Sequence, residues 1–330
     1  MKPNIHDIFS ISSAEQFRQL ALSVFRFQAT ENPVYKTWLE NLKIRVEDVQ
    51  EIEQIPFLPI GFFKTHTVLS EQMPATDPLV FTSSGTTGMV QSRHFVSDPT
   101  VYEKSYLDAF HYFYGDIQNY CVLALLPSYL ERDGSSLIYM ADDLIKKSKH
   151  PKSGFYLHNY EELIATIQQL KAQKQKTILL GVTYALLDIA EQFLLAENSD
   201  LIVMETGGMK GKRKEMVREE LHEILSKGLG VKKIHSEYGM TELLSQGYST
   251  GDGIFNCPPW MKILIRDTND PFSILEQTKS GGINVIDLAN INSCAFIATQ
   301  DLGKIYPDNS FEVLGRFDNS DIRGCNLLVQ

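Results

Sequence analysis

The feature that most constrains the fold is an alternation of short apolar runs with longer amphipathic segments between about residues 78 and 230. The short runs have the length of buried β-strands, and the longer segments repeat their apolar residues at helical spacing. Strands that alternate with helices are typical of β-α-β units, in which successive strands pair in parallel. We therefore predict an α/β fold with mostly parallel sheets flanked by helices.

The expected elements can be placed by residue number. The predicted strands of this region are 79–81, 120–126, 177–182 and 201–204. The predicted helices are 101–113, 161–172, 184–195 and 212–226. Upstream, a helix is expected over 14–29, and the segment 55–64 is expected to be extended because its prolines disfavour helix.

The last hundred residues have a different pattern, made of short, turn-bounded apolar runs with little helical periodicity. These runs are 234–235, 262–266, 283–288, 295–299 and 311–314. They predict a β-rich lobe. The chain length of 330 residues allows about two domains, or one large α/β unit. We expect an N-terminal helical and extended segment (1–70) packed on the core, an α/β subdomain (71–230) and a β-rich subdomain with a C-terminal tail (231–330).

Composition narrows the possible functions. The chain is 43% hydrophobic, which is ordinary for a globular protein with a real core. Its 31 basic and 41 acidic residues give a net charge of −10, which is poorly suited to neutralising phosphate backbones, so we expect no nucleic-acid partner. The apolar runs are too short for a membrane span, and the N-terminus lacks the apolar stretch of a signal peptide. The expected location is the cytoplasm.

The cysteines do not suggest a structural role. There are four, at positions 121, 257, 294 and 325, and no two form a C-x-x-C pair. Four cysteines at such wide spacing predict neither a zinc site nor a disulfide framework.

A hydroxyl- and glycine-rich loop follows the first predicted strand, with the sequence Thr82-Ser83-Ser84-Gly85-Thr86-Thr87-Gly88. Its glycines allow tight turns that expose backbone N–H groups, and its hydroxyls add further donors, so the loop can surround an oxyanion. A polar turn without a ligand is the alternative reading of such a heptapeptide. The segment 207–212 imitates a P-loop, but its spacing is one residue short and no Ser or Thr follows.

This loop resembles the phosphate-binding loop of the acyl-adenylate-forming superfamily, which includes acyl-CoA synthetases, firefly luciferase and peptide-synthetase adenylation domains. Four further segments resemble motifs of that superfamily, in the same order along the chain. They are Gly207-Gly208, Tyr238-Gly239-Met240-Thr241-Glu242, Gln300-Asp301-Leu302-Gly303 and Gly315-Arg316-Phe317-Asp318. The resemblance implies the fold of the N-terminal domain of these enzymes, with 71–230 as the nucleotide-binding subdomain, and ATP and Mg²⁺ as cofactors.

The resemblance also implies roles for individual residues. Tyr238 would stack on adenine, Thr241 would contact the α-phosphate and act in catalysis, and Glu242 would ligate Mg²⁺. Asp301 would accept hydrogen bonds from the ribose hydroxyls, and Arg316 would add charge nearby. The residues implied in ATP binding are Ser83, Ser84, Gly85, Thr86, Thr87, Gly88, Gly207, Gly208, Tyr238, Gly239, Thr241, Asp301 and Arg316. The lysine that usually follows the phosphate loop is replaced here by Met89-Val90-Gln91-Ser92.

Nearly the whole chain resembles a narrower family, the LuxE-type acyl-protein synthetases. Segments 57–64, 126–132 and 315–325 carry this resemblance, and the chain ends soon after the hinge motif, where ordinary adenylating enzymes continue into a mobile C-terminal domain. Members transfer the acyl group from the adenylate to a cysteine of their own near the C-terminus, which implies Cys325 as the nucleophile. The alternative for this residue is a small packed side chain on a terminal strand.

The expected function is therefore activation of a carboxylic acid, by analogy a fatty acid, as acyl-AMP, followed by transfer to Cys325. An acyl-reductase or acyltransferase protein is the expected partner. Two alternatives stay open: an acyl- or aryl-CoA ligase or carrier-protein-loading ligase, and a non-catalytic nucleotide- or acyl-binding partner subunit.

Overall fold

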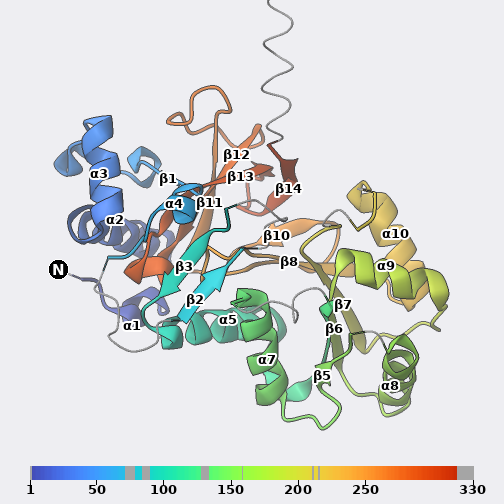
Figure 1. Cartoon of the computed structure of the whole chain (residues 1–330). Helices are drawn as coiled ribbons and strands as arrows, with labels where there is room; N and C mark the ends of the chain where they lie inside the picture. The colour runs from blue at the N-terminus through green and yellow to red at the C-terminus, as the bar shows by residue number, and fades with distance from the viewer. Residues whose placement is uncertain are drawn as a thin grey trace, which may run out of the picture. The chain divides into compact units, whose positions relative to one another are not determined.

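A computed structural model describes residues 2–70, 79–83, 90–127, 134–157, 159–209, 212–214 and 216–317 of the chain (Figure 1). The chain forms two compact units. Unit 1 combines the N-terminal residues 1–78 with the C-terminal residues 259–330, and unit 2 comprises residues 79–258. Each unit is described by itself.

The helices of unit 1 lie in its N-terminal segment. They are α1 (Ile5–Ile8), α2 (Ala14–Glu31), α3 (Pro33–Leu42) and α4 (Phe62–Thr65), with 3₁₀ turns η1 (Val46–Asp48) and η2 (Ile52–Gln54). The side chain of Ser13 caps α2, and Asn32 caps α3, whose first residue is a proline. The predicted helix 14–29 is confirmed. The expectation of extended structure over 55–64 is wrong at Phe62–Thr65, which form one helical turn after the second proline.

The sheet of unit 1 is antiparallel. It runs β11 (Met261–Arg266), β12 (Ser280–Asp287), β13 (Phe296–Ile305) and β14 (Phe311–Arg316). The two-residue strand β1 (Leu58–Pro59) pairs in parallel with the first part of β13, and the 3₁₀ segment η4 (Leu288–Asn292) follows β12. The β-rich character predicted for these strands is confirmed.

Unit 2 contains a mostly parallel sheet. Its strand order is β5 (Gly154–Phe155), β4 (Cys121–Leu125), β6 (Thr177–Val182), β7 (Leu201–Thr206) and β8 (Ile234–Tyr238), all parallel. Two antiparallel strands, β9 (Gly247–Ser249) and β10 (Ile254–Asn256), extend the sheet beyond β8. A separate hairpin joins β2 (Leu79–Thr82) to β3 (Arg93–Val96).

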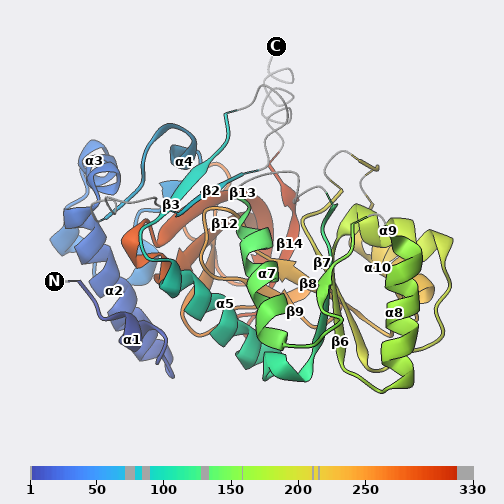
Figure 2. The same ribbon diagram turned by 60° about the horizontal axis from the view of Figure 1, so that its bottom comes forward.

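Helices cover both faces of this parallel sheet. They are α5 (Pro99–Tyr114), α7 (Ser136–Ser148), α8 (Tyr160–Ala172), α9 (Thr183–Gln192) and α10 (Arg218–Leu229), with a 3₁₀ turn η3 (Ile117–Asn119). In both views α5 and α7 lie on one side of the strands, and α8, α9 and α10 lie on the other (Figures 1 and 2). This is the layering expected for β-α-β units. No helix among the described residues combines the length and apolarity needed to cross a membrane.

Candidate active site

The hydroxyl-rich loop starts from the β2–β3 hairpin of unit 2. Its second residue, Ser83, makes two hydrogen bonds with Ser92: the Ser83 N–H donates to the Ser92 carbonyl at 3.1 Å, and the Ser92 N–H donates to Ser83 Oγ at 2.9 Å. These bonds close the base of the loop. The predicted loop residues Ser84, Gly85, Thr86, Thr87 and Gly88 lie outside the described residues.

The same hairpin is tied to the Y-G-x-T-E segment. His94 on β3 is fully buried, and its Nδ1 donates to the carbonyl oxygen of Thr241 at 2.8 Å. A carbonyl can only accept, so this bond fixes which ring nitrogen carries the proton. Glu242 follows directly and is only 5% exposed. The structure therefore brings Thr241 next to the strand that leaves the hydroxyl-rich loop.

The two glycines of the Gly207-Gly208 segment follow β7 without a break. Their φ angles are +76° and +68°, a left-handed conformation that only glycine adopts without strain. A Cβ added at Gly208 would meet no atom within 4 Å, so the backbone conformation, not crowding, explains this glycine. The pair turns the chain sharply at the carboxyl end of the parallel sheet.

Tyr238 ends the neighbouring strand β8. It is 8% exposed, and its ring packs edge-on against Phe255 with the centroids 6.1 Å apart. The guanidinium of Arg218 lies over the same Phe255 ring, 5.3 Å from its centroid. Because parallel strands end at the same edge, Tyr238 and the turn at Gly207-Gly208 both lie at the carboxyl edge of the sheet.

Two carboxylates lie on these adjacent strands but in different surroundings. Glu205 on β7 accepts hydrogen bonds from Thr183 Oγ1 at 2.8 Å and Ser236 Oγ at 2.9 Å, and His222 Nε2 lies 3.5 Å away. Burial opposes its ionisation, but these contacts and the charge of Arg218 outweigh it and lower the pKa of Glu205.

Glu237 on β8 has fewer donors. Burial raises its pKa to about 7, the nearby charge of Glu205 adds to the rise, and one hydrogen bond from Thr206 opposes it. At neutral pH, Glu205 is therefore ionised, while Glu237 is poised between its protonated and ionised forms.

In unit 1, the structure brings Asp301 and Arg316 together. They are register partners on β13 and β14, and Arg316 Nε donates to Asp301 Oδ1 at 3.0 Å. The Asp301 side chain is 9% exposed, whereas that of Arg316 is 73% exposed. The ion pair holds the carboxylate in one orientation while Arg316 remains largely in solvent.

A buried arginine supports the segment that carries Asp301. Arg266 Nη1 donates to the Ile283 carbonyl and Asn284 Oδ1, both at 2.8 Å, and Nη2 donates to the Thr299 carbonyl at 2.6 Å. The hydroxyl of Thr299 in turn accepts from the Asp301 N–H at 3.1 Å. Arg266 thus fixes the backbone two residues before Asp301.

The cysteines fall into three classes. Cys325 lies outside the described residues. Burial raises the pKa of Cys121 and raises that of Cys294 to about 12, which makes both poor nucleophiles near neutral pH. Cys257 is half-buried.

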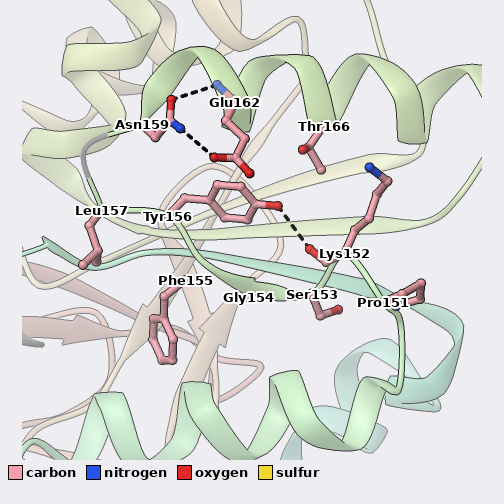
Figure 3. Close-up of a pocket in the computed structure, with 10 residues that line it drawn as sticks. All are labelled: Pro151, Lys152, Ser153, Gly154, Phe155, Tyr156, Leu157, Asn159, Glu162 and Thr166. Carbon is pink, nitrogen blue, oxygen red and sulfur yellow. Dashed lines mark hydrogen bonds between the residues drawn. The ribbon is translucent and has the colours of Figure 1, made fainter.

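A cavity of about 590 Å³ in unit 2 lies elsewhere. It is formed by β5, the residues around it and the start of α8, where Asn159 caps the helix and bonds Glu162 (Figure 3). Tyr156 lies across the cavity and donates to the Lys152 carbonyl at 3.3 Å. None of the predicted site residues that the structure describes lines this cavity.

No protein-family model matches the chain, and no curated protein sequence matches it. Several solved structures resemble it. A 2-hydroxyisobutyryl-CoA ligase, solved in an open conformation with 2-HIB-AMP and CoA, is 11% identical with a TM-score of 0.64 over 92% of this chain and 70% of that one. ATP-bound MatB from Rhodopseudomonas palustris is 18% identical with a TM-score of 0.52 over 72% of this chain and 47% of that one. An ATP-bound RpMatB-BxBclM chimera is 19% identical with a TM-score of 0.53 over 72% of this chain and 47% of that one.

The predicted fold is confirmed. The chain has the mixed α/β fold of the N-terminal part of acyl-adenylate-forming enzymes. It spans about half the length of the MatB structures that it resembles. At these identities the likeness establishes the fold, and the activity is a separate proposal.

Sequence reasoning missed three residues that contact the motif segments or support their backbone: Thr206 and Glu237 in unit 2, and Arg266 in unit 1. Each is a polar or charged residue at a strand position, and each strand otherwise reads as apolar or leads directly into a motif. Thr206 precedes Gly207, and Glu237 precedes Tyr238. An ionisable residue directly before a motif, at the end of a predicted strand, is the signal that could have identified Glu237.

Proposed function

We propose that this chain is an ATP-dependent ligase that activates a carboxylic acid as an acyl-adenylate. The observation that carries the proposal is the position of Tyr238-Gly239-Met240-Thr241-Glu242 at the carboxyl end of the parallel strand β8, in a fold like that of a ligase holding 2-HIB-AMP. In open α/β sheets, ligands bind beyond the carboxyl ends of the strands. Gly207-Gly208 follows the same end of the adjacent strand β7.

The proposed reaction joins a carboxylate oxygen to the α-phosphorus of ATP and breaks the bond to the β-phosphate, so that pyrophosphate leaves. Tyr238 stacks on adenine, Thr241 contacts the α-phosphate, and the loop 83–88 holds the departing pyrophosphate. Asp301, oriented by Arg316, accepts hydrogen bonds from the ribose hydroxyls. The nucleophile already carries its negative charge, so positioning and charge neutralisation supply most of the catalysis.

Glu242 fits a role toward Mg²⁺. The described residues contain no group of three or more His, Cys, Asp or Glu side chains that could hold a metal, so a cage made of protein alone is absent there. Mg²⁺ in nucleotide sites is typically held by one or two carboxylates together with the phosphates. One buried carboxylate next to Thr241 suits that arrangement, and the ion would neutralise charge on the triphosphate.

The resemblance to acyl-protein synthetases supports a second step on Cys325. Its thiolate would attack the acyl carbon, form a thioester and release AMP. The high pKa values of Cys121 and Cys294 disfavour these two residues as acceptors. In this proposal the substrate is a fatty or similar carboxylic acid, and an acyl-reductase or acyltransferase protein takes the acyl group onward.

Exchange of labelled pyrophosphate into ATP tests the first step. The chain, with ATP, Mg²⁺ and a panel of aliphatic and aromatic acids, should catalyse exchange that depends on one class of acid. Asp301→Asn should raise the KM for ATP about tenfold, because a charged hydrogen-bond partner of the ribose is lost. Binding of ATP without exchange for any acid would instead support a nucleotide-binding subunit.

Intact-mass measurement tests the second step. Wild-type protein with ATP and its acid should gain the mass of one acyl group, and Cys325→Ala should gain none. Cys257→Ala is the matched control and should be acylated like the wild type. An adduct that persists in Cys325→Ala would refute the acceptor assignment, and turnover only upon addition of CoA would favour a CoA ligase.

A further inference from the structure

We propose that Glu237 is a positioning residue, which holds the Gly207-Gly208 turn and the Tyr238-Gly239 segment in the arrangement that binds the adenosine end of ATP. The inference rests on the proposed function, since it assumes that this nucleotide binds there. It adds a residue pair, Thr206 and Glu237, that none of the recognised motifs contains.

One oxygen of Glu237 accepts a hydrogen bond from the neighbouring strand. Thr206 Oγ1 donates to Glu237 Oε2 at 2.5 Å. Thr206 is the last residue of β7, immediately before the two left-handed glycines, and Glu237 is the penultimate residue of β8, immediately before Tyr238. Backbone pairing between these strands extends as far as Glu205 and Ser236. The side-chain bond therefore continues the connection beyond the last paired residues.

The other oxygen of Glu237 lies against the second segment. A Cβ built on Gly239 would be 2.3 Å from Glu237 Oε1, so the carboxyl group occupies the space that a side chain at position 239 would need. The same carboxyl group thus contacts residues that flank Gly207 on one strand and Tyr238 on the other.

The position of Glu237 favours an effect on nucleotide binding over one on overall folding. Its contacts are at the carboxyl edge of the sheet, where the chain leaves the strands, whereas the sheet itself is held by backbone pairing and buried apolar residues. Loss of the Thr206 bond should therefore loosen the two segments more than it loosens the core. Pre-organised loops bind ligands more tightly because less ordering is required on binding.

The test compares the binding of ATP, AMP and pyrophosphate by titration calorimetry. AMP reports the adenosine end, and pyrophosphate reports the phosphate end. Thr206→Val removes the hydroxyl with little change of shape and should raise the Kd for ATP and AMP about five- to tenfold, the effect expected from one hydrogen bond. The Kd for pyrophosphate should change less than about twofold. Glu237→Ala should act like Thr206→Val, and Glu237→Gln, which keeps an acceptor oxygen, should recover most of the affinity.

The matched control is Thr177→Val at the opposite end of the sheet. Thr177 begins β6, is buried and donates to the Gln175 carbonyl at 2.9 Å, so this variant loses a similar hydrogen bond far from the motifs. It should bind all three ligands like the wild type. Unchanged AMP affinity in Thr206→Val, or equal losses of AMP and pyrophosphate affinity, would overturn the positioning role. In that case, ATP binding by the wild type would still uphold the proposed function. Failure of the wild type to bind ATP would refute the proposed function itself.

Discussion

At the scale of single residues, hydrogen-bond donors decide the charge of two neighbouring glutamates. Glu205 has two hydroxyl donors and an imidazole contact, and its pKa is lowered, whereas Glu237 has one hydroxyl donor and a pKa of about 7. A carboxyl group that is buried with few donors keeps its proton to a higher pH. The difference bears on stability, because the unfolded chain ionises Glu237 at a lower pH than the folded chain does.

The sign of this effect can be tested with Glu237→Gln. The folded state binds the Glu237 proton more tightly than the unfolded state, whose pKa is near 4.5, so this group's contribution to stability is complete below about pH 4.5 and is lost as pH rises to about 7. The variant cannot ionise. Its free energy of unfolding relative to the wild type should therefore increase between about pH 5 and pH 8, by on the order of 1–3 kcal/mol. Urea denaturation at the two pH values measures this, and a difference that stays constant with pH would contradict it.

The sequence points to some residues of the proposed site and misses others for a physical reason. Tyr238, Asp301 and Arg316 belong to short motifs whose order along the chain is informative, and the structure pairs Asp301 with Arg316. Glu237 and Thr206 lie side by side only because β7 and β8 are neighbouring strands. Local sequence patterns do not predict which strands are neighbours.

At the scale of elements, helix α10 illustrates how packing sets boundaries. The periodicity predicts a helix over 212–226, but α10 spans Arg218–Leu229. Its last turn lies against α9, and Gly230 in a left-handed conformation ends it. Local patterning located the helix, and its ends depend on the neighbouring helix and on the glycine cap.

The close approach of α9 and α10 requires Gly228. A Cβ at this position would be 2.3 Å from the Ala190 carbonyl oxygen and 2.7 Å from Ala190 Cα, which are atoms that cannot move independently of the helix. Gly228→Ala should lower the free energy of unfolding by about 2–3 kcal/mol, since overpacking forces a backbone shift. Gly154→Ala, whose Cβ would meet nothing within 4 Å, is the control. Equal stability of the two variants in urea denaturation would argue against the close contact.

Several other elements were not predicted, among them β3 and α7. The strand β3 starts with Arg93 and His94, so it does not read as an apolar run, although His94 is buried. Helix α7 begins after Ser135, whose side chain caps it.

At the scale of the whole molecule, the first 70 residues and the last strands belong to one compact unit. Gln28 on α2 is fully buried; its Nε2 donates to the carbonyls of Asn290 and Ile291, and its Oε1 accepts from the Ala295 N–H, each at 2.9 Å. One side chain thus satisfies three backbone groups more than 260 residues away in sequence. Such contacts are not local in sequence, so periodicity could not predict which strands the N-terminal helices cover.

Gln28→Met should reveal how much this connection contributes. The change keeps the side-chain volume but leaves three buried backbone groups without these partners, and we expect a loss of about 2–4 kcal/mol in the free energy of unfolding. Gln19→Met on the same helix is the control, because Gln19 is exposed and bonds only to Glu15, and it should cost less than about 0.5 kcal/mol. A Gln28 variant as stable as the Gln19 variant would show that the hydrogen bonds of Gln28 contribute little to holding the N-terminal helices.

Formation of an acyl-adenylate can be tested by following the oxygen atoms of the acid. With a carboxylic acid labelled with ¹⁸O in both oxygens, attack on the α-phosphorus and later acyl transfer should leave one ¹⁸O in AMP, which mass spectrometry detects. Acyl-adenylate formation predicts labelled AMP and unlabelled pyrophosphate, and without the protein the label should stay in the acid and no labelled AMP should form. Label in inorganic phosphate with formation of ADP, or AMP without label, would contradict acyl-adenylate formation.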